Sequence, residues 1–186
     1  MKDTLLCRRM FLKSSAFLAA TMLGAKSAFA KLIDGDGAPE GKLSLYNRNI
    51  GERLTVTYRN CLGEYCDDAL QSINWLFRCH ETNETTNMDL RVLEYLNRLD
   101  NSLGGDNEIH IISGYRSPSY NSKLRSVSKG VAKKSLHMKG MAIDLVIPGI
   151  GLDRTRKTAM ALAAGGVGYY PRDGFVHIDS GAFRSW

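Results

Sequence analysis

The sequence predicts an α+β domain, in which helices flank a small, mostly antiparallel sheet. Three observations lead to this fold class. Short alternating apolar and polar stretches, typical of strands, occur together with longer stretches that have apolar residues every three or four positions, typical of helices. Most of the strands come in pairs joined by short turns, which favours antiparallel pairing. No internal repeat or low-complexity linker interrupts the chain, whose length suits one domain.

The first half of this domain contains a hairpin and two helices. Residues 42–46 and 53–58 alternate in polarity on either side of Asn-Arg-Asn-Ile-Gly, which predicts a β-hairpin. A helix is expected to begin at two aspartates and to cover residues 67–80. A second helix, over residues 88–103, is closed by a pair of glycines. The apolar stripes of both helices are typical of core faces.

The second half returns to strands. Residues 108–112 form an expected strand, and a short polar helix or loop separates it from a second strand over residues 141–147. A third helix covers residues 152–164 and ends at two glycines. The strands 167–170 and 175–179 then pair around Pro-Arg-Asp-Gly, which is a turn sequence.

The first thirty residues are expected to be a cleaved export signal. The stretch CRRMFLK precedes a moderately apolar segment over residues 17–23, and Ala28-Phe29-Ala30 suits a signal peptidase. The paired arginines resemble a twin-arginine signal, with Cys7 where Ser or Thr is usual. An uncleaved anchor is the alternative, but the apolar segment is shorter than the ~20 residues of a spanning helix. We therefore expect a single mature domain, residues 31–186, exported to the bacterial periplasm and without a stable membrane span.

The positive charge lies largely in this leader. It holds five of the 25 Lys and Arg residues and one of the 19 Asp and Glu residues, so its removal lowers the formal net charge from +6 to +2. Nucleic-acid binding thereby loses its main support. The acid-free segment between Glu108 and Asp144 keeps several cations, which suit either an anionic substrate or an ordinary solvated face. These cations are Arg116, Lys123, Arg125, Lys129, Lys133, Lys134 and Lys139.

Three cysteines remain after the leader, at positions 61, 66 and 79. An odd number outside the cytoplasm suggests one disulfide and one free or buried thiol. Cys66 and Cys79 lie about 20 Å apart along one expected helix and cannot pair with each other. The expected disulfide therefore joins Cys61 to one of these two. The CxxxxC spacing of Cys61 and Cys66 has no histidine or further cysteine nearby that would make a zinc knuckle.

His137, Asp144 and His177 are the candidate metal ligands. An aspartate within the apolar run Met141–Ile147 costs free energy unless it is paired. Catalytic zinc commonly takes three protein ligands and keeps a position for water, and two histidines with one aspartate fit that pattern. If the two strands are neighbours, their two-residue period brings the side chains together. Backbone hydrogen bonding by these residues is the simpler alternative.

Several ordered motifs extend this hypothesis. The string from Ser135 to Asp144 resembles the S-x-H-x-x-G-x-A-x-D signature of the M15 zinc D,D-peptidases. The sequences SGYRS at 113–117 and FVH at 175–177 are similar to that family's arginine-bearing strand end and closing histidine. Together with GGVGYYPR and the final tryptophan, they resemble most closely the YcbK-type branch, which consists of exported bacterial murein endopeptidases.

The resemblance implies roles for individual residues. It makes His137, Asp144 and His177 the ligands of Zn²⁺ and gives the domain the M15 peptidase fold. It makes Arg116 the residue that holds a substrate carboxylate or polarises the scissile carbonyl, for which a planar guanidinium is well suited. Ser135 either hydrogen-bonds substrate or caps a turn.

The position of the proton-transfer group departs from the family pattern. Much of the family has Glu or Asp three residues before the last histidine, where this chain has Gly174. Another branch has His two residues before it, where this chain has Phe175. Asp173, in the expected turn, is the substitute we favour as base, although an Asp-Gly pair is also ordinary turn chemistry. Asp179, two residues after His177, is expected to orient that imidazole.

These features predict an exported zinc metallopeptidase that hydrolyses amide bonds in peptidoglycan stem peptides or cross-links. They do not decide between D-Ala–diaminopimelate, diaminopimelate–diaminopimelate and a terminal D-Ala. Lys133 and Lys134 are the cations expected to face this acidic polymer. The alternatives are a D,D-carboxypeptidase and a non-catalytic peptidoglycan-binding module, and the missing acid before His177 favours the latter. A structural zinc site would need a fourth protein ligand.

Overall fold

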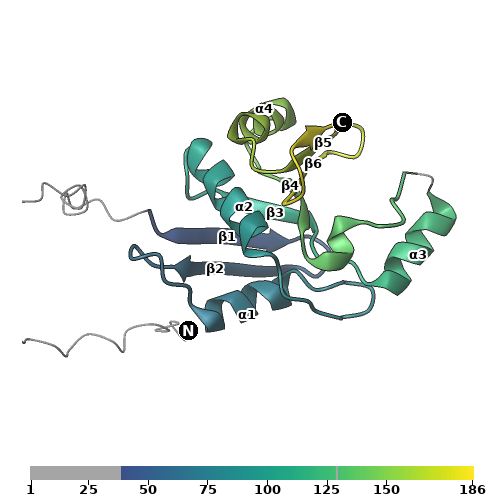
Figure 1. The fold of residues 1–186 in the computed structure, drawn as a ribbon, viewed down its shortest axis with the longest axis horizontal. Coiled ribbons are helices and arrows are strands. Elements are labelled where there is room, and N and C mark those ends of the chain that lie inside the picture. The colour runs from purple at the N-terminus through teal and green to yellow at the C-terminus, as the bar shows by residue number, and fades with distance from the viewer. Residues whose placement is uncertain (1–38, 129) are drawn as a thin grey trace, which may run out of the picture.

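A computed structural model describes residues 39–128 and 130–186, and the expected export signal lies outside them. These residues fold around one seven-stranded sheet of order β2-β1-β3-β4-β6-β5-β7 (Figure 1). Four of its strand pairings are antiparallel, while β1–β3 and β5–β7 are parallel. The α+β class is confirmed, and the sheet is larger and more mixed than the sequence suggested.

The expected hairpin consists of β1 (Gly41–Asn47) and β2 (Glu52–Arg59), which pair antiparallel. The first helix, α1 (Asp67–Leu76), ends earlier than expected. The chain leaves the helix at Phe77, whose carbonyl accepts a hydrogen bond from the backbone N–H of Tyr115 at 2.8 Å. This tertiary contact holds the chain just beyond the end of the helix, at a point where the apolar pattern would have continued it.

The middle of the chain contains α2 (Leu90–Ser102), β3 (Glu108–Ser113), α3 (Pro118–Val127), the 3₁₀ helix η2 (Leu136–Lys139) and β4 (Ala142–Val146). The parallel pairing of β3 with β1 brings the hairpin into the same sheet as the later strands. Because β4 pairs antiparallel with β3, the chain returns along the sheet after the excursion through α3 and η2.

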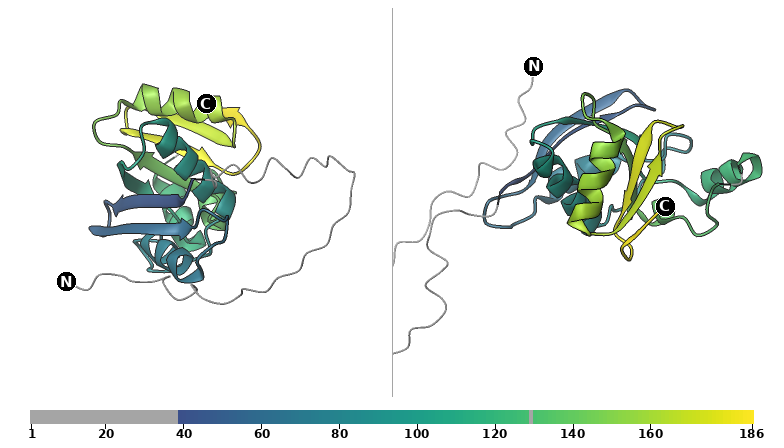
Figure 2. Two further views of the ribbon diagram at one scale, coloured as in Figure 1. Left: turned by 90° about the vertical axis from the view of Figure 1, so that its left-hand side faces the viewer. Right: turned by 90° about the horizontal axis from the view of Figure 1, so that it is seen from above.

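The last elements are α4 (Leu152–Leu162), β5 (Gly166–Tyr170), β6 (Phe175–Asp179) and a short β7 (Arg184–Ser185). They confirm the third helix and the final strand pair of the sequence analysis. Helix α4 lies against α2 and against β5 and β6, so these two helices cover one face of the sheet (Figure 2).

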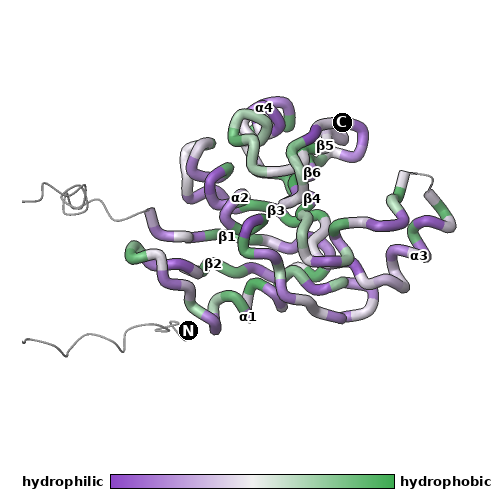
Figure 3. Tube along the Cα trace, viewed as in Figure 1, coloured by the Kyte–Doolittle hydropathy of each residue, from purple (hydrophilic) through white to green (hydrophobic). Residues whose placement is uncertain are grey.

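The hydrophobic core lies between the sheet and these helices, where the central strands are the apolar part of the trace (Figure 3). Ile143 and Leu145 of β4 and Val176 and Ile178 of β6 all belong to this core and are fully buried. Side chains alternate between the two faces of a strand, so the residues between them point to the opposite face. The polar positions of β4 and β6 therefore lie on the face away from α2 and α4.

Helix α3 protrudes from the body of the domain in Figure 1 and in the right-hand view of Figure 2. Its residues are largely exposed, and Asn121 is the buried exception among them. The helix begins after Arg116 and the chain returns to the domain at Ser135. The protruding segment therefore separates two of the sequence motifs along the chain without separating them in space.

The expected disulfide is not formed. Cys61 is an exposed free thiol and Cys79 is a buried free thiol, so Cys61 pairs with neither of its two candidate partners. The argument from helix length was also wrong for Cys79, which lies beyond the end of α1. In the described part of the chain, no helix is both long and apolar enough to cross a bilayer.

Candidate metal centre

Two neighbouring strands and one turn bring the three candidate ligands together. Asp144 of β4 and His177 of β6 are directly opposite each other in the antiparallel register. His137 comes from η2, which ends at Gly140 in the left-handed region with φ of 65°. A Cβ at Gly140 would lie 2.6 Å from the carbonyl oxygen of Asn87, so only glycine fits this turn. The glycine of the motif thus places His137 over the start of the strand.

One potential ligand atom from each of these three side chains lies within 4.8 Å of the others. His137 Nε2 is 3.3 Å from His177 Nδ1 and 3.3 Å from Asp144 Oδ2. His177 Nδ1 is 2.7 Å from Asp144 Oδ1. A tetrahedral zinc with bonds of about 2.0–2.1 Å separates its ligand atoms by roughly 3.3 Å. The donor types and spacing therefore fit a zinc ion.

Each imidazole is oriented through its other nitrogen. His137 Nδ1 is 2.8 Å from the carbonyl oxygen of Gly114, to which it donates, so its Nε2 is left as a lone-pair donor. His177 Nε2 is 3.1 Å from Asp179 Oδ2, which leaves Nδ1 facing the centre. A carboxylate or carbonyl behind each histidine is the usual support of a metal-binding imidazole.

Asp179 is itself held by several donors. Its Oδ1 and Oδ2 atoms accept hydrogen bonds from Arg184 Nη1 at 3.0 Å and Nη2 at 2.7 Å, respectively. The backbone N–H of Gly181 also donates to Oδ1, at 2.8 Å. A Cβ at Gly166 would lie 2.4 Å from Asp179 Oδ2 and 2.5 Å from Arg184 Nη1, so glycine makes room for this pair. The network fixes the carboxylate that in turn fixes His177.

The electrostatics of the centre follow from these contacts. Burial alone would raise the pKa of Asp144, but His137 and His177 outweigh it and hold that pKa well below its ordinary value. Burial likewise opposes ionisation of Asp179, whose pKa is nevertheless lowered by His177 and Arg184. Burial alone would lower the pKa of His177, but hydrogen bonds to the two carboxylates raise it. Both aspartates are thus kept as carboxylates near neutral pH.

Arg116 lies at the edge of the centre. Its Nη2 is 3.7 Å from Asp144 Oδ2 and 3.3 Å from Ser113 Oγ, and its backbone N–H donates to the carbonyl of His137. The Nε atom of Arg116 is buried and has no hydrogen-bond partner among the described residues. Ser135 begins η2 and is buried, but its hydroxyl makes no capping hydrogen bond. A cap is therefore not the role of this side chain.

Asp173 is not part of this cluster. It is exposed in the turn between β5 and β6 and makes no hydrogen bond or ion pair with any described residue. Lys133 and Lys134 are also exposed, and neither forms a salt bridge within residues 39–128 and 130–186. Of the four predicted catalytic residues, Arg116 and Asp179 lie close to candidate metal ligands in the structure. Ser135 lies two residues before His137 in the chain, and Asp173 lies outside the cluster.

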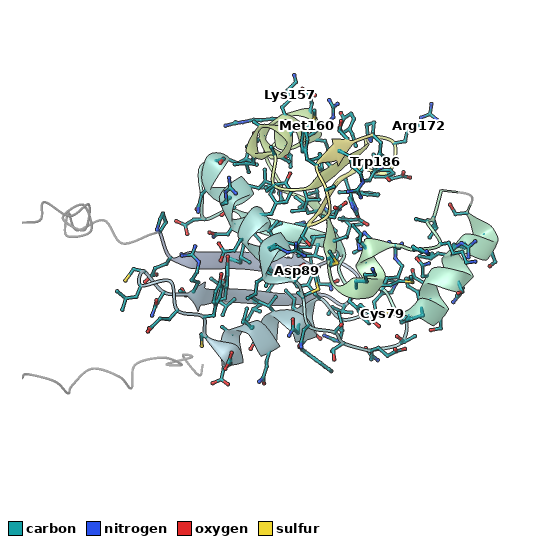
Figure 4. The ribbon with its side chains drawn as sticks, in the orientation of Figure 1. Cys79, Asp89, Lys157, Met160, Arg172 and Trp186 are labelled. Carbon is teal, nitrogen blue, oxygen red and sulfur yellow. The ribbon has the colours of Figure 1, made fainter. Side chains whose placement is uncertain are left out.

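Sequence reasoning missed Arg184 and Gly114 and gave Trp186 no role at the site. The ring of Trp186 lies 5.3 Å from that of His177, and its Nε1 donates to the Tyr170 hydroxyl at 2.7 Å. Figure 4 shows Trp186 beside β5 and β6. Half-exposed, it forms one wall of the centre. The position of Arg184, five residues after an aspartate in an apolar strand, could have indicated that the two side chains pair. The role of the Gly114 carbonyl could not be predicted in this way, because a backbone carbonyl leaves no mark in the pattern of side chains.

Comparison with known proteins assigns the chain to a family. Residues 37–186 match the family described as peptidoglycan L,D-endopeptidase MepK. The protein of that name from Escherichia coli (strain K12) is 44% identical over 144 residues, which cover 77% of this chain and 79% of the relative. A Haemophilus influenzae protein described as a probable peptidoglycan L,D-endopeptidase MepK is 40% identical over 145 residues, 77% of each chain. The match includes the whole candidate centre, and the chain belongs to the MepK family of M15-type peptidases.

Proposed function

We propose that this chain is a zinc-dependent endopeptidase that hydrolyses an amide bond in peptidoglycan stem peptides or their cross-links. The observation that carries the proposal is the convergence of His137 Nε2, His177 Nδ1 and the Asp144 carboxylate, with the remaining nitrogen of each imidazole already occupied. The relatives, which are named peptidoglycan L,D-endopeptidases, support the same substrate and reaction.

His137, Asp144 and His177 would hold the zinc ion. When bound, zinc supplies Lewis acidity that polarises the scissile carbonyl and makes water a better nucleophile near neutral pH. The protein contributes the geometry of the site. Asp179 and Arg184 on one side and the Gly114 carbonyl on the other keep the two imidazoles from rotating, so no ligand has to be reoriented when substrate arrives.

Arg116 would bind the negative charge of the substrate or of the transition state. Its guanidinium lies beside Asp144, and its Nη groups would donate to an incoming carboxylate or oxyanion. Ser135, whose hydroxyl makes no capping bond, would donate to or accept from the same substrate. Lys133 and Lys134 would attract the acidic polymer.

We assign proton transfer to Asp173, the carboxylate of the β5–β6 turn. Its exposed position requires the turn to approach the centre when substrate binds. A comparison of Asp173→Ala with the wild type tests this role, because loss of a general base or acid costs typically 10²–10⁴-fold in rate. A rate within a factor of two of the wild type would remove Asp173 from the mechanism.

The relatives' names narrow the bond to be cut. An L,D-endopeptidase acts between an L-configured and a D-configured centre. Of the three bonds left open by the sequence, the diaminopimelate–diaminopimelate cross-link meets that description. The other two join D centres, and so the D,D-carboxypeptidase alternative loses support.

We also propose that residues 1–30 direct export by the twin-arginine route and that residues 31–186 act in the periplasm. The support is the order of charged, apolar and small residues in the leader together with the cell-wall activity named for the relatives.

The whole proposal is tested with purified protein, zinc and soluble muropeptides. We expect new products in chromatography with the wild type and stoichiometric zinc by metal analysis. Neither should be obtained with His137→Ala. A wild-type protein that binds zinc but releases no product over a range of pH values would instead support the non-catalytic wall-binding module, which the absence of an acid at Gly174 favours.

A further inference from the structure

A second surface of the molecule has features of a ligand site. On α1, Trp75 is 54% exposed, although a side chain of this size is usually buried. Gln71 precedes it by one helical turn, so the two side chains share one face of the helix. Together they form a ridge, here called the Trp75 ridge, which stands between two open hollows of about 550 and 490 Å³. Both volumes fall within the range of small-molecule sites, ~300–1,000 Å³. Neither hollow is lined by a candidate metal ligand.

The indole of Trp75 is held rigidly from one side. The guanidinium of Arg78 lies 4.2 Å from the centre of the indole ring. Arg78 is in turn fixed by two hydrogen bonds to the Glu52 carboxylate, at 2.6 and 2.9 Å, and by one to the carbonyl of Trp75. The Arg78 guanidinium, which is paired with Glu52, covers only one face of the indole. The exposed remainder of the ring is a preorganised apolar surface.

The polar side chains that line the second hollow are all neutral, whereas the wall of the first hollow also includes Glu52, Arg53 and Asp68. Within the second hollow, Asn74 and Asn87 hydrogen-bond to each other at 3.2 Å. The side chains of Gln71, Thr85 and Thr86 make no hydrogen bonds with residues that the structure describes, and all three line the second hollow. Amide and hydroxyl groups around an exposed indole match the chemistry of a sugar ring, which presents C–H groups on its faces and hydroxyl or acetamido groups at its edge. They do not match a charged peptide.

The loop at the rim of the second hollow packs against the turn that follows His137. Asn87, at its rim, has its carbonyl oxygen 2.6 Å from where a Cβ of Gly140 would lie. Two residues further on, the backbone N–H of Asp89 donates to the Gly140 carbonyl at 2.9 Å. Gly140 is three residues from His137. A polymer on the ridge would therefore run toward the metal centre along the loop over residues 85–87.

From this arrangement, we propose that the Trp75 ridge binds the glycan strand of peptidoglycan, a chain of N-acetylated amino sugars, and so holds the enzyme on the polymer whose peptides it cuts. The inference rests on the proposed function for the choice of polymer. It adds a second binding site, separate from the metal centre, and the ligand of this second site is the sugar chain.

The test measures binding of the full-length protein to glycan strands from which the stem peptides have been removed. We expect Trp75→Ala to weaken binding about tenfold or more, because truncation of a stacked aromatic removes its whole contact surface, and Trp75→Phe to keep it within about threefold. Gln71→Ala should also weaken it. Phe183→Ala, a change at a similarly exposed aromatic in another part of the surface, is the matched control and should bind as the wild type does.

Two further readouts separate this site from the metal centre and from simple charge attraction. Hydrolysis of small soluble muropeptides by Trp75→Phe and Gln71→Ala should equal that of the wild type, whereas digestion of intact sacculi by Gln71→Ala should be slower. Binding through neutral groups should change little between 50 and 300 mM salt, since only charge–charge contacts are screened.

The inference is overturned if the wild type does not bind peptide-free glycan while it cuts soluble muropeptides, an outcome that leaves the proposed function intact. It is equally overturned if Trp75→Ala and Gln71→Ala bind as the wild type does, or if salt abolishes binding. Should Trp75→Ala fail to fold, Gln71→Ala decides the matter, with wild-type affinity counting against the site.

Discussion

The metal centre and the Trp75 ridge differ in whether their polar side chains are buried and hydrogen-bonded. At the centre, His137, Asp144, His177 and Asp179 are buried and connected by hydrogen bonds of 2.7–3.3 Å. At the ridge, the side chains of Gln71, Thr85 and Thr86 line an open hollow and make no hydrogen bonds with residues that the structure describes. A buried polar group must be paired within the fold, whereas an exposed one is satisfied by water until a ligand replaces it.

This difference bears on what each region can do. The paired groups of the centre have fixed orientations, as needed for chemistry that depends on the positions of single atoms. The unpaired groups of the ridge can adapt to a repeating polymer and release it. Substitutions at the centre should therefore stop hydrolysis of every substrate, and substitutions at the ridge should affect only the polymer.

The largest effect is expected for His137→Ala. The loss of one ligand should remove zinc and lower turnover by about a thousandfold or more, since metal catalysis supplies several kcal/mol of transition-state stabilisation. Metal analysis and muropeptide chromatography measure the two quantities. His110→Ala is the control, because His110 bonds to Glu108 in β3 and is no candidate ligand. Equal losses in both variants would mean that the His137 variant is misfolded.

Arg116→Ala is expected to lower kcat/KM by about 10²–10³-fold without loss of zinc, because the group that meets developing charge is removed while the ligands stay. Arg116→Lys should restore little of this activity, since lysine lacks the planar fork that binds a carboxylate or oxyanion through two N–H groups. A full rescue by lysine would mean that only the positive charge matters. Loss of zinc from either variant would assign Arg116 to the structure of the site.

Asp179→Ala should weaken zinc binding about 10–100-fold, the usual cost of losing the support behind a ligand. The same change removes an interaction that raises the pKa of His177, so protons compete less with the metal and the acid limb of zinc binding should move to lower pH. Titrations with a metal indicator between pH 5 and 8 measure both effects. An unchanged acid limb would show that Asp179 does not act through His177.

Acid should destabilise the fold through the same carboxylate. The pKa of Asp179 is lowered in the folded state, so its contribution to the free energy of unfolding is complete above the unfolded pKa, ~3.9, and is lost as the pH falls toward the folded pKa. The pKa of His177 is raised, so its contribution is present below ~6.5 and is lost as the pH rises through the folded value. Urea unfolding of chelator-treated protein from pH 8 to 3 should show both limbs, and Asp179→Asn should flatten them.

The sequence predicted those parts of the centre that depend on local spacing. Asp144 and His177 each interrupt an apolar strand, and Gly140 marks the turn before one of them, so short-range patterns carried the information. The helices α1, α2 and α4 and the two hairpins were predicted for the same reason, whereas α3 was left open as a helix or a loop and η2 was not predicted. All of these features are encoded within a few residues along the chain.

The features that were missed depend on contacts between distant segments. The parallel pairing of β1 with β3 and the hydrogen bond of His137 to the Gly114 carbonyl follow from how the segments pack. Cysteine pairing could not be predicted for the same reason, because whether Cys61 reaches a partner depends on how distant segments pack, and the thiols of Cys61 and Cys79 are free. The exposure of Trp75 has no signal either, since an aromatic residue next to an apolar helical stripe is ordinarily part of the core.

The smallest expected effect belongs to Arg78→Lys, which tests whether the Trp75 ridge must be rigid. Lysine keeps the charge next to Glu52 but loses the two-pronged bond to it and the flat surface that lies on the indole. The free energy of unfolding should fall by about 1 kcal/mol or less, since Glu52 is partly exposed to water. Binding of peptide-free glycan should weaken about two- to fivefold, because a mobile indole loses more freedom on binding, about 0.5–1 kcal/mol. Soluble muropeptides should be cut at the wild-type rate.

If glycan binding were unchanged while the melting temperature fell, Arg78 would serve the fold alone, and the ridge would not depend on being held in place.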